Sequence, residues 1–378
     1  MIALMKQKVK YFLRLFLVKV MGMSKCIVAP VGLENYQDRK TIHSPIRFKR
    51  KVPKFSFPLH YKFYPNAKGI QAESERTFIQ QLNNVRVFSR NGFVISKSNK
   101  LVSETNSEDE RCNYLLDNFF FRKVKKVNHL SLLVTAKDAS LNYFHWMTDA
   151  LPKISIAEKA GFTLNQIDVF IVSNDSLRFQ QETLAHLGIK KEKRLSLSGQ
   201  SLIFCNELIM PSATCLSGNV SPWIIDYLRM VFKDWMQPDP TLPSNIFIGR
   251  KKGGKRVLLN ENQIVKAVEE KNFKMIYLEE FSVCEQVKLF YNAKQIVGVH
   301  GAGLTNLLFS QPGCFVVELF PVNYVNQCYW TIASYNDLEY TYILGEGKDI
   351  ADTTNHLIDE DFVVSVEKLL QLFENNLA

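Results

Sequence analysis

The C-terminal part of the chain alternates short apolar runs with amphipathic segments, and this alternation restricts the fold more than any other feature. Runs typical of buried strands and segments with helical spacing follow one another at 245–249, 261–271, 274–278, 283–293, 295–299, 305–310, 314–319, 327–335 and 340–344. A strand, a helix and a further strand in this order form a right-handed crossover, which makes the strands parallel. The sequence therefore predicts a Rossmann-like α/β domain over residues 244–350, followed by a C-terminal helix within 351–378.

The upstream boundary of this domain is predicted at 237–243, where three prolines can continue neither a helix nor a central strand. Residues 63–236 again mix apolar runs with helical segments. The predicted fold class is therefore α/β. It has two Rossmann-like domains, over 63–236 and 244–350, which face a central cleft and are joined by the linker.

Positive charge is concentrated in residues 1–62, which contain fourteen Lys and Arg but only two acidic residues, whereas the whole chain carries a net charge of +10. Within 1–23, apolar residues share one helical face flanked by basic residues, and no apolar run reaches the roughly 18 residues that a membrane span requires. Two interpretations of this basic arm stay open. It is a helix on an anionic membrane surface, or a helix packed on the protein body. Nucleic acid is not a predicted partner, because no recognised binding module accompanies the charge.

The cysteine and acidic patterns argue against disulfides and metals. None of the seven cysteines forms a CxxC pair, and several lie in apolar runs, which is typical of a reducing, cytoplasmic compartment. The one Asp-x-Asp triplet, at 359–361, opens the last predicted helix, where the helix dipole favours acidic residues. No metal site is therefore predicted.

A glycine-rich turn follows the apolar run at 295–299. Gly301, Ala302 and Gly303 open the next helix, where a close backbone approach and free N–H groups favour a phosphate. Position 306 is Asn, so the full GxGxxG of dinucleotide-dependent dehydrogenases is absent. The alternative is a tight turn with a structural role alone.

Two further stretches suit a nucleotide diphosphate. Arg250 and Arg256 flank two glycines, and their guanidinium groups can bind phosphate oxygens. Glu318 lies late in the strand at 314–319, where a carboxylate can accept hydrogen bonds from ribose hydroxyls. A solvated basic loop and a structural carboxylate are the respective alternatives.

In the N-terminal domain, Asn142, His145 and Asp149 share one helical face. Asp149 alone, or His145 oriented by a neighbour, could remove a proton from an attacking hydroxyl. The alternative is a helix surface without a role.

The segment 142–152, the stretch from Arg250 to Glu261 and the segment 280–321 resemble glycosyltransferase family 61 in order and spacing, and the resemblance extends over about residues 85–345. It implies a GT-B-like fold, inversion at the anomeric carbon and no metal requirement. With the motifs, it assigns Asp149 and His145 to catalysis. Acceptor binding falls to Asn142 and Trp146. The donor-binding residues that it implies are Arg250, Arg256, Asn260, Glu280, His300, Gly301, Ala302, Gly303, Asn306 and Glu318.

The predicted function is transfer of a sugar from a nucleotide diphosphate, UDP-linked, to a glycan or lipid-linked acceptor, with the nucleotide-sugar as substrate and no cofactor. Eukaryotic members of the family usually carry an N-terminal membrane span, so the interrupted apolar pattern at 1–23 favours the bacterial members that make capsular or other surface polysaccharide. The expected location is the cytoplasm, at the inner face of the plasma membrane. The alternative function is a non-catalytic scaffold that binds a nucleotide-sugar or glycan in a polysaccharide assembly complex.

Overall fold

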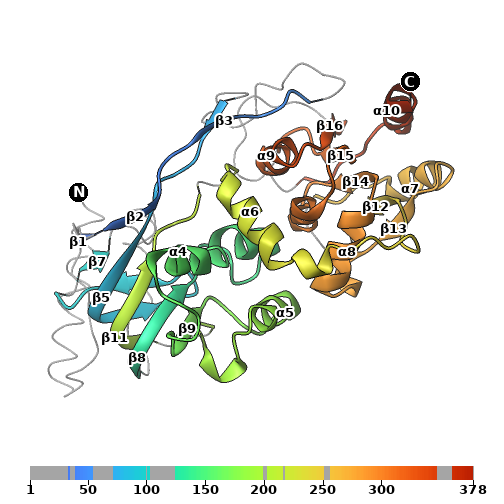
Figure 1. The fold of residues 1–378 in the computed structure, drawn as a ribbon. Helices are drawn as coiled ribbons and strands as arrows, with labels where there is room; N and C mark the ends of the chain where they lie inside the picture. The colour runs from blue at the N-terminus through green and yellow to red at the C-terminus, as the bar shows by residue number, and fades with distance from the viewer. Residues whose placement is uncertain are drawn as a thin grey trace. The chain divides into compact units, whose positions relative to one another are not determined.

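The computed structural model describes residues 33–34, 39–53, 71–98, 100–102, 124–198, 202–215, 218–250, 256–346 and 360–377. These residues form two units, shown in Figure 1. Unit 1 comprises Met1–Ser44 and Arg76–Thr214, and unit 2 comprises Pro45–Glu75 and Cys215–Ala378. The predicted helix within 1–23 and the loop 251–255 lie outside the described residues. In the described part of the chain, no helix has the length and apolar character needed to cross a membrane.

Unit 2 is built on a parallel sheet of five strands in the order β13-β12-β14-β15-β16. Their bounds are Asn245–Ile248 for β12, Lys274–Ile276 for β13, Gln295–Val299 for β14, Phe315–Phe320 for β15 and Glu339–Leu344 for β16. All six residues of β15 are buried, which is typical of a strand covered on both faces. The predicted parallel α/β sheet of this region is confirmed.

Helices cover both faces of this sheet. Their bounds are Glu261–Glu269 for α7, Val283–Asn292 for α8, Ala302–Phe309 for the 3₁₀ helix η6, Cys328–Tyr335 for α9 and Val366–Leu377 for α10. α10 packs against α7, and both share a core with Phe247 and Val317, while α9 packs on η6 and β16. Because successive strand side chains point to opposite faces, Glu318 lies on the face away from the Val317 core.

The boundary between the units does not lie at the predicted linker. The helix α6 (Pro222–Val231), with the 3₁₀ turn η4 (Lys233–Trp235), belongs to unit 2. Arg229 of α6 donates to the carbonyls of Leu308 and Ser310 at 2.7 and 3.1 Å. Asn292 of α8 hydrogen-bonds to the backbone of the proline-rich segment, at Gln237 O and Asp239 N. The segment 237–243 is thus held on unit 2, and the division falls between 214 and 215.

Unit 1 has a mixed sheet in the order β1-β7-β6-β5-β11-β8-β9-β10, with β2 also paired to β5. The strands are β1 (Leu33–Glu34), β2 (Lys40–His43), β5 (Thr77–Phe88), β6 (Phe93–Ile95), β7 (Leu101–Val102), β8 (Val124–Val134), β9 (Val169–Val172), β10 (Arg194–Ser196) and β11 (Leu202–Pro211). The strands β11, β8, β9 and β10 form a continuous run of parallel pairs, as a Rossmann-like sheet requires, and β1 also pairs in parallel with β7 at the other edge. The strands β5, β6 and β7 are antiparallel because tight turns, such as Ser89 to Gly92, join them as hairpins. The prediction of a second Rossmann-like domain is therefore right for only part of this sheet.

The helical segments of unit 1 are α3 (Tyr143–His145), the π-helix η2 (Trp146–Ala150), α4 (Lys153–Ala160), α5 (Arg178–His186) and the 3₁₀ turn η3 (Lys191–Lys193). The helix predicted to carry Asn142, His145 and Asp149 on one face is therefore not continuous, because α3 passes into the π-helix η2 before α4 begins. The π-helix closes with a hydrogen bond from Leu151 N to Trp146 O at 2.9 Å. Such π-helical turns occur often at functional sites.

The predicted basic arm is not one segment. Its described part contributes β2 to unit 1, and to unit 2 it contributes β3 (Arg47–Lys49), which pairs with β4 (Gln71–Glu73). Arg50 is buried in unit 2, where it donates to Thr331 Oγ1 at 2.8 Å and to Asn219 Oδ1 and lies over the Trp330 ring. Arg50 is therefore a core residue and does not face a membrane surface.

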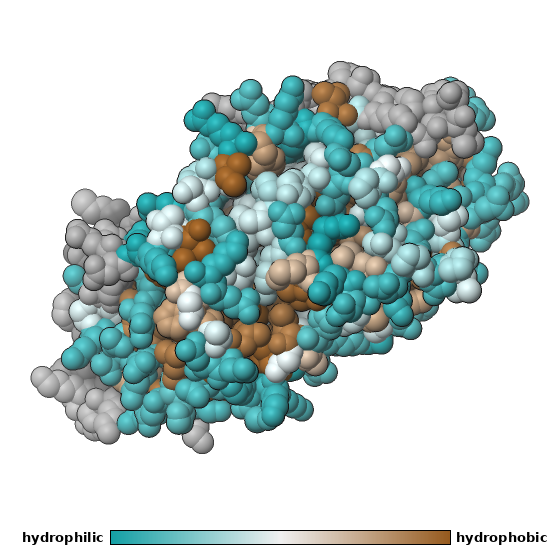
Figure 2. All heavy atoms as spheres, in the orientation of Figure 1, coloured by the Kyte–Doolittle hydropathy of each residue, from teal (hydrophilic) through white to brown (hydrophobic). Residues whose placement is uncertain are grey.

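Hydrophilic side chains cover most of the face shown in Figure 2, and hydrophobic residues reach that surface in patches. Scattered apolar residues of this kind are ordinary on protein surfaces.

Candidate functional site

A pocket of about 280 Å³ opens in unit 2 at the carboxyl ends of β12 and β14. It is lined by Ile248, Gly249, Arg250, Leu278, Glu279, Val299, Gly301, Ala302, Gly303 and Leu304. The chain leaves β12 toward β13 on one side and returns to β14 on the other. This is the topological switch point of the sheet, the place where open α/β sheets bind ligands.

Arg250 and Gly301 fit one another in this pocket. The guanidinium of Arg250 donates to the carbonyl oxygen of His300 at 2.6 Å. A Cβ atom on Gly301 would lie 1.7 Å from Nη2 of Arg250, so only glycine leaves room for this arrangement. Burial lowers the pKa of Arg250, and the neighbouring charge of Arg256 lowers it further. Two close guanidinium groups repel each other, so a bound anion would stabilise both.

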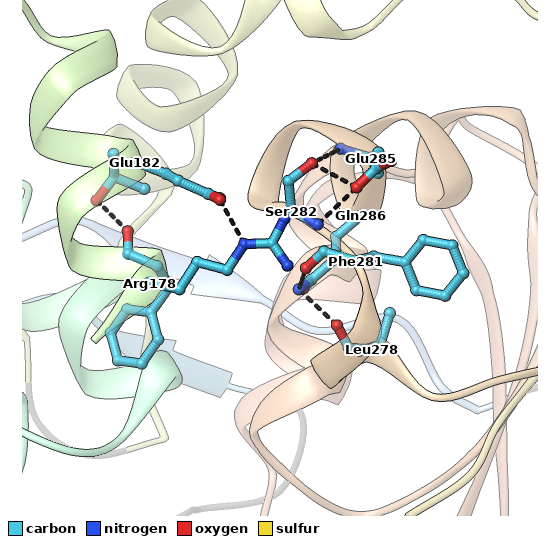
Figure 3. Close-up of polar contacts among 9 residues, drawn as sticks. Arg178, Glu182, Leu278, Phe281, Ser282, Glu285 and Gln286 are labelled. Atoms are coloured by element: carbon cyan, nitrogen blue, oxygen red, sulfur yellow. Dashed lines mark hydrogen bonds and ion pairs between the residues drawn. The ribbon is translucent and has the colours of Figure 1, made fainter.

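Amide hydrogen bonds join the elements around the pocket, and Figure 3 shows the one from Gln286 to Leu278. Gln286 of α8 donates to Leu278 O at 2.9 Å and to Phe281 O at 3.2 Å, and so holds the 3₁₀ turn η5 (Leu278–Glu280). Gln286 Oε1 accepts from Asn306 Nδ2 of η6 at 2.9 Å. Asn306, predicted to bind the donor, is thus fully buried and connects two walls of the pocket.

The first turn of α8 is fixed by the sequence itself. Ser282 and Glu285 form a capping box, in which Glu285 N donates to Ser282 Oγ at 3.2 Å and Ser282 N donates to Glu285 Oε2 at 2.7 Å. The box satisfies two free N–H groups and places Gln286 one position later.

Glu318 is fully buried and both of its carboxylate oxygens accept hydrogen bonds. Nδ1 of His300 lies 2.5 Å from Oε1, and the hydroxyl of Tyr340 donates to Oε2 at 2.6 Å. The structure therefore places Glu318 against His300, not against open space where a ribose could bind directly.

The other predicted donor-binding residues lie at different distances from the pocket. Gly303 and Ala302 line it, while Asn260 binds the backbone of Val364 through both amide atoms, at 2.8 and 3.1 Å. Glu280 is exposed on η5, and its neighbour Glu279 lines the pocket instead. Sequence analysis did not identify Glu279, because a turn of three residues is too short to show a periodicity.

Arg256 stacks over the ring of Tyr324, 4.5 Å from its centroid, and this ring also contacts the His300 imidazole. The structure thus brings together Arg250, Arg256, His300 and the Gly301 turn, and it leaves Asn260 elsewhere.

In unit 1, His145 and Asp149 form a close pair. Nδ1 of His145 lies 2.6 Å from Oδ2 of Asp149, and both side chains are about four-fifths buried, at 21% and 18% exposure. Thr148 Oγ1 lies 2.8 Å from Oδ1 of Asp149. Asn142 begins α3 as its N-cap, and its side-chain oxygen accepts a hydrogen bond from Phe144 N at 2.9 Å.

The electrostatics of this pair favour a basic imidazole. Burial acts to lower the pKa of His145, but the hydrogen bond and charge of Asp149, with the charge of Asp138, outweigh it and raise this pKa above 6.5. Lys153, one turn after Asp149, is 8% exposed, and burial lowers its pKa to about 8. Among the residues that the structure describes, no hydrogen bond or ion pair forms at the Lys153 ammonium.

Trp146 is fully buried, and its indole N–H donates to Thr183 Oγ1 at 2.9 Å. It is a core residue of unit 1, so its predicted contact with an acceptor is not supported by this geometry.

One protein-family model matches a segment of the chain that includes residues from both units. Residues 143–317 match the family model described as Glycosyltransferase 61. The match begins at α3 and ends in β15, so it includes His145 and Asp149 of unit 1 and Arg250, His300 and Gly301 of unit 2. For this part of the chain, the resemblance to glycosyltransferase family 61 is confirmed.

Curated relatives are similar over shorter segments. Protein O-linked-mannose beta-1,4-N-acetylglucosaminyltransferase 2 is 33% identical over 108 residues in Bos taurus and 34% in Takifugu rubripes, covering 27% of this chain and 18% of each relative. The EGF domain-specific O-linked N-acetylglucosamine transferase of Gallus gallus is 30% identical over 90 residues, 22% of this chain and 17% of the relative. The chain thus matches less than a fifth of the length of these animal proteins, and the bacterial assignment stays a prediction.

Proposed function

We propose that the chain is an inverting glycosyltransferase that moves a sugar from a UDP-linked donor to a hydroxyl of a glycan or lipid-linked acceptor. The observation that carries the proposal is the fitted pair of Arg250 and Gly301 at the switch point of a parallel sheet. The match to the glycosyltransferase 61 model supports the reaction class. The relatives are named as N-acetylglucosamine transferases, so N-acetylglucosamine is the first candidate sugar.

The donor diphosphate would bind at the Gly301 turn. Arg250 and Arg256 supply positive charge there, and the N-terminus of η6 supplies free N–H groups. When the glycosidic bond to the diphosphate breaks, negative charge grows on the leaving phosphate, and these fixed groups stabilise it. This mechanism requires no metal ion.

The base in this proposal is His145. Its Nδ1–H donates to Asp149, which fixes the tautomer and leaves Nε2 to accept the proton of the attacking hydroxyl. Asp149 acts as the orienting partner, because His145 already occupies its Oδ2 and Thr148 lies at its Oδ1.

The proposed acceptor and its location are argued from the amino-acid sequence. Basic residues within 1–62 suit an anionic membrane surface, so a lipid-linked glycan at the inner face of a bacterial plasma membrane is the proposed setting for surface polysaccharide synthesis.

The test is turnover by the full chain. UDP release is measured from UDP-N-acetylglucosamine and from the corresponding glucose, galactose and N-acetylgalactosamine donors, with and without simple glycoside acceptors and EDTA. We expect UDP release from at least one of these donors, and we expect this release to persist when EDTA is present. We expect His145→Ala to cut kcat by roughly 10²–10⁴-fold. The matched control is Glu192→Gln, which removes an exposed carboxylate from η3 of the same unit.

Three outcomes would contradict the proposal. Donor binding without turnover favours the non-catalytic scaffold. Activity lost in EDTA and restored by Mn²⁺ overturns the metal-free mechanism. An unimpaired His145→Ala variant removes His145 as the base.

A further inference from the structure

The two ring nitrogens of His300 differ in their contacts, because Nδ1 has a hydrogen-bond partner within the protein and Nε2 has none among the described residues. Nδ1 is 2.5 Å from Glu318 Oε1. Among the residues that the structure describes, none hydrogen-bonds to Nε2. The side chain is only 5% exposed, but Nε2 is not one of the fully buried atoms that lack a partner, so the small exposed part of the ring includes this nitrogen. An acceptor that is held in place and accessible in this way is a contact point for a ligand.

The ring is held rigidly in this orientation. It stacks on Phe320 with centroids 4.9 Å apart, and Tyr324 and Tyr329 contact it at 5.2 Å each. Glu318 cannot turn away, because Tyr340 donates to its other oxygen at 2.6 Å.

The same contacts determine which ring nitrogen of His300 carries the proton. The Glu318 carboxylate accepts two hydrogen bonds, one from the Tyr340 hydroxyl and one from His300, so the proton of the imidazole lies on Nδ1. Burial lowers the pKa of His300, as do the charges of Arg256 and Arg250, while Glu318 opposes them. The imidazole is therefore neutral near pH 7, and Nε2 is a bare acceptor.

A bare acceptor selects among the parts of a nucleotide-sugar. Phosphate oxygens only accept hydrogen bonds, so they cannot satisfy Nε2, whereas sugar hydroxyls can donate to it. The carbonyl of His300 binds Arg250, and the next residue, Gly301, lines the pocket. The hydroxyl that reaches Nε2 therefore belongs to a sugar ring that adjoins the diphosphate.

We propose that Glu318 and Tyr340 act as positioning residues that fix His300, so that its Nε2 accepts a hydrogen bond from a sugar hydroxyl next to the donor diphosphate. This inference rests on the proposed function, which supplies the nucleotide-sugar. It replaces direct recognition of the ribose by Glu318 with recognition through His300. The ribose and the transferred sugar are the two possible sources of the hydroxyl.

The experiment measures the affinity of the full chain, by calorimetry, for UDP, 2′-deoxy-UDP, 3′-deoxy-UDP and UDP-N-acetylglucosamine. His300→Asn is the central variant, because its amide can still donate to Glu318 but has no atom at the position of Nε2. If the hydroxyl is on the ribose, the wild type should bind one deoxy analogue about tenfold more weakly than UDP, and the variant should bind both alike. If it is on the transferred sugar, the variant should lose about tenfold for UDP-N-acetylglucosamine only.

Tyr340→Phe tests the positioning role and serves as a second variant if His300→Asn does not fold. Alone, it should weaken the same ligands several-fold, about 3- to 10-fold. In the His300→Asn background it should cause no further loss, because it acts through His300, whereas a merely structural role would add to the loss.

Equal affinity of His300→Asn and wild type for both UDP and UDP-N-acetylglucosamine overturns this inference while leaving the proposed function intact. A wild-type chain that binds none of the four ligands overturns the proposed function itself, so the two failures are distinguishable.

Discussion

Two histidine–carboxylate pairs show how the same two groups acquire different chemistry from their surroundings. Asp149 and the nearby Asp138 raise the pKa of His145 despite its burial. Burial, with a smaller contribution from the charges of Arg256 and Arg250, lowers the pKa of His300 although Glu318 acts to raise it. Environments that move such pKa values apart are a guide to acid and base roles. Here they leave His145 the stronger base and His300 a neutral hydrogen-bond acceptor.

The first prediction concerns the pH dependence of turnover. His145 must be neutral to accept a proton, and its pKa is raised above 6.5. We expect kcat/KM of the wild type to rise with pH, with the midpoint of its acid limb above 6.5. In Asp149→Asn the imidazole loses the carboxylate that stabilises its protonated form, so the midpoint should move to lower pH while the maximal rate falls.

The charged groups that act on His145 are Asp149, Asp138 and Lys137. Asp138→Asn provides the control, because it should shift the midpoint in the same direction but retain the maximal rate. An acid limb that is identical in the wild type and Asp149→Asn would show that another group titrates.

The second prediction concerns the unfolding free energy and Lys153. Burial lowers its pKa from 10.5 to about 8, so the folded state binds this proton less tightly than the unfolded state does. The contribution of Lys153 to stability should therefore rise as pH increases from about 8 to 10.5. At pH 7 its charge costs about 3 kcal/mol. Lys153→Met should raise the free energy of unfolding by that order at pH 7.

Other Lys and Tyr residues titrate in the same range, so the difference between wild type and variant is the quantity to follow by urea denaturation. This difference should shrink as pH rises from 8 to 10.5. A constant difference would mean that the ammonium is not the cause.

At the scale of elements, the third prediction concerns the turn between β14 and η6. Gly301→Ala puts a Cβ atom against Nη2 of Arg250, the far end of a flexible side chain. The guanidinium can move at small cost to the fold, but it must then leave the His300 carbonyl. We expect UDP affinity to fall at least about tenfold, the value of one charged hydrogen bond, with little change in thermal stability.

Gly313→Ala is the control in the same unit, because a Cβ atom there meets nothing within 4 Å and Gly313 does not line the pocket. It should bind UDP as the wild type does. If Gly301→Ala also retains the wild-type affinity, Arg250 does not contact the diphosphate.

The same turn shows what the sequence can reveal about elements and what it cannot. The strand β14 was predicted with its observed bounds, because four apolar or small residues after Gln295, followed by a glycine-rich turn, leave few alternatives. Glu318 was placed in the correct strand, but its partner Tyr340 lies in the adjacent strand β16, and pairing between distant segments leaves no local signal. Asn306 was read as a ligand residue because an amide buried between two helices has the same sequence signature as an amide at a ligand.

The π-helix of unit 1 was missed for a related reason. A period of 3.6 residues fitted the apolar positions around 142–152 well enough to predict one continuous helix. The extra residue of the π-helical turn appears only in the hydrogen bond from Leu151 to Trp146. The pattern of apolar residues alone could not predict the π-helical turn, because it does not show which backbone groups form the hydrogen bonds.

At the scale of the whole chain, the order of segments along the sequence differs from their grouping in space. The chain passes from unit 1 to unit 2 after Ser44, returns after Glu75 and passes again after Thr214. The stretch 1–62 was predicted to be a single arm because fourteen of its sixteen Lys, Arg, Asp and Glu residues are basic. Charge along the sequence does not show burial, and Arg50 is buried whereas Arg47 is exposed.

The fourth prediction compares these two arginines. Arg50 donates to Thr331 and Asn219 and lies over Trp330, so Arg50→Met leaves one buried and one partly buried acceptor without their donor. We expect a loss of about 2–4 kcal/mol in the free energy of unfolding, measured by chemical denaturation. Arg47 forms only an exposed pair with Glu73, with 87% and 55% of the side chains exposed. Arg47→Met should therefore change stability by less than about 0.5 kcal/mol. Since both variants remove one positive charge, equal effects would attribute the loss to net charge instead of to the buried contacts that tie residues 45–53 to α9.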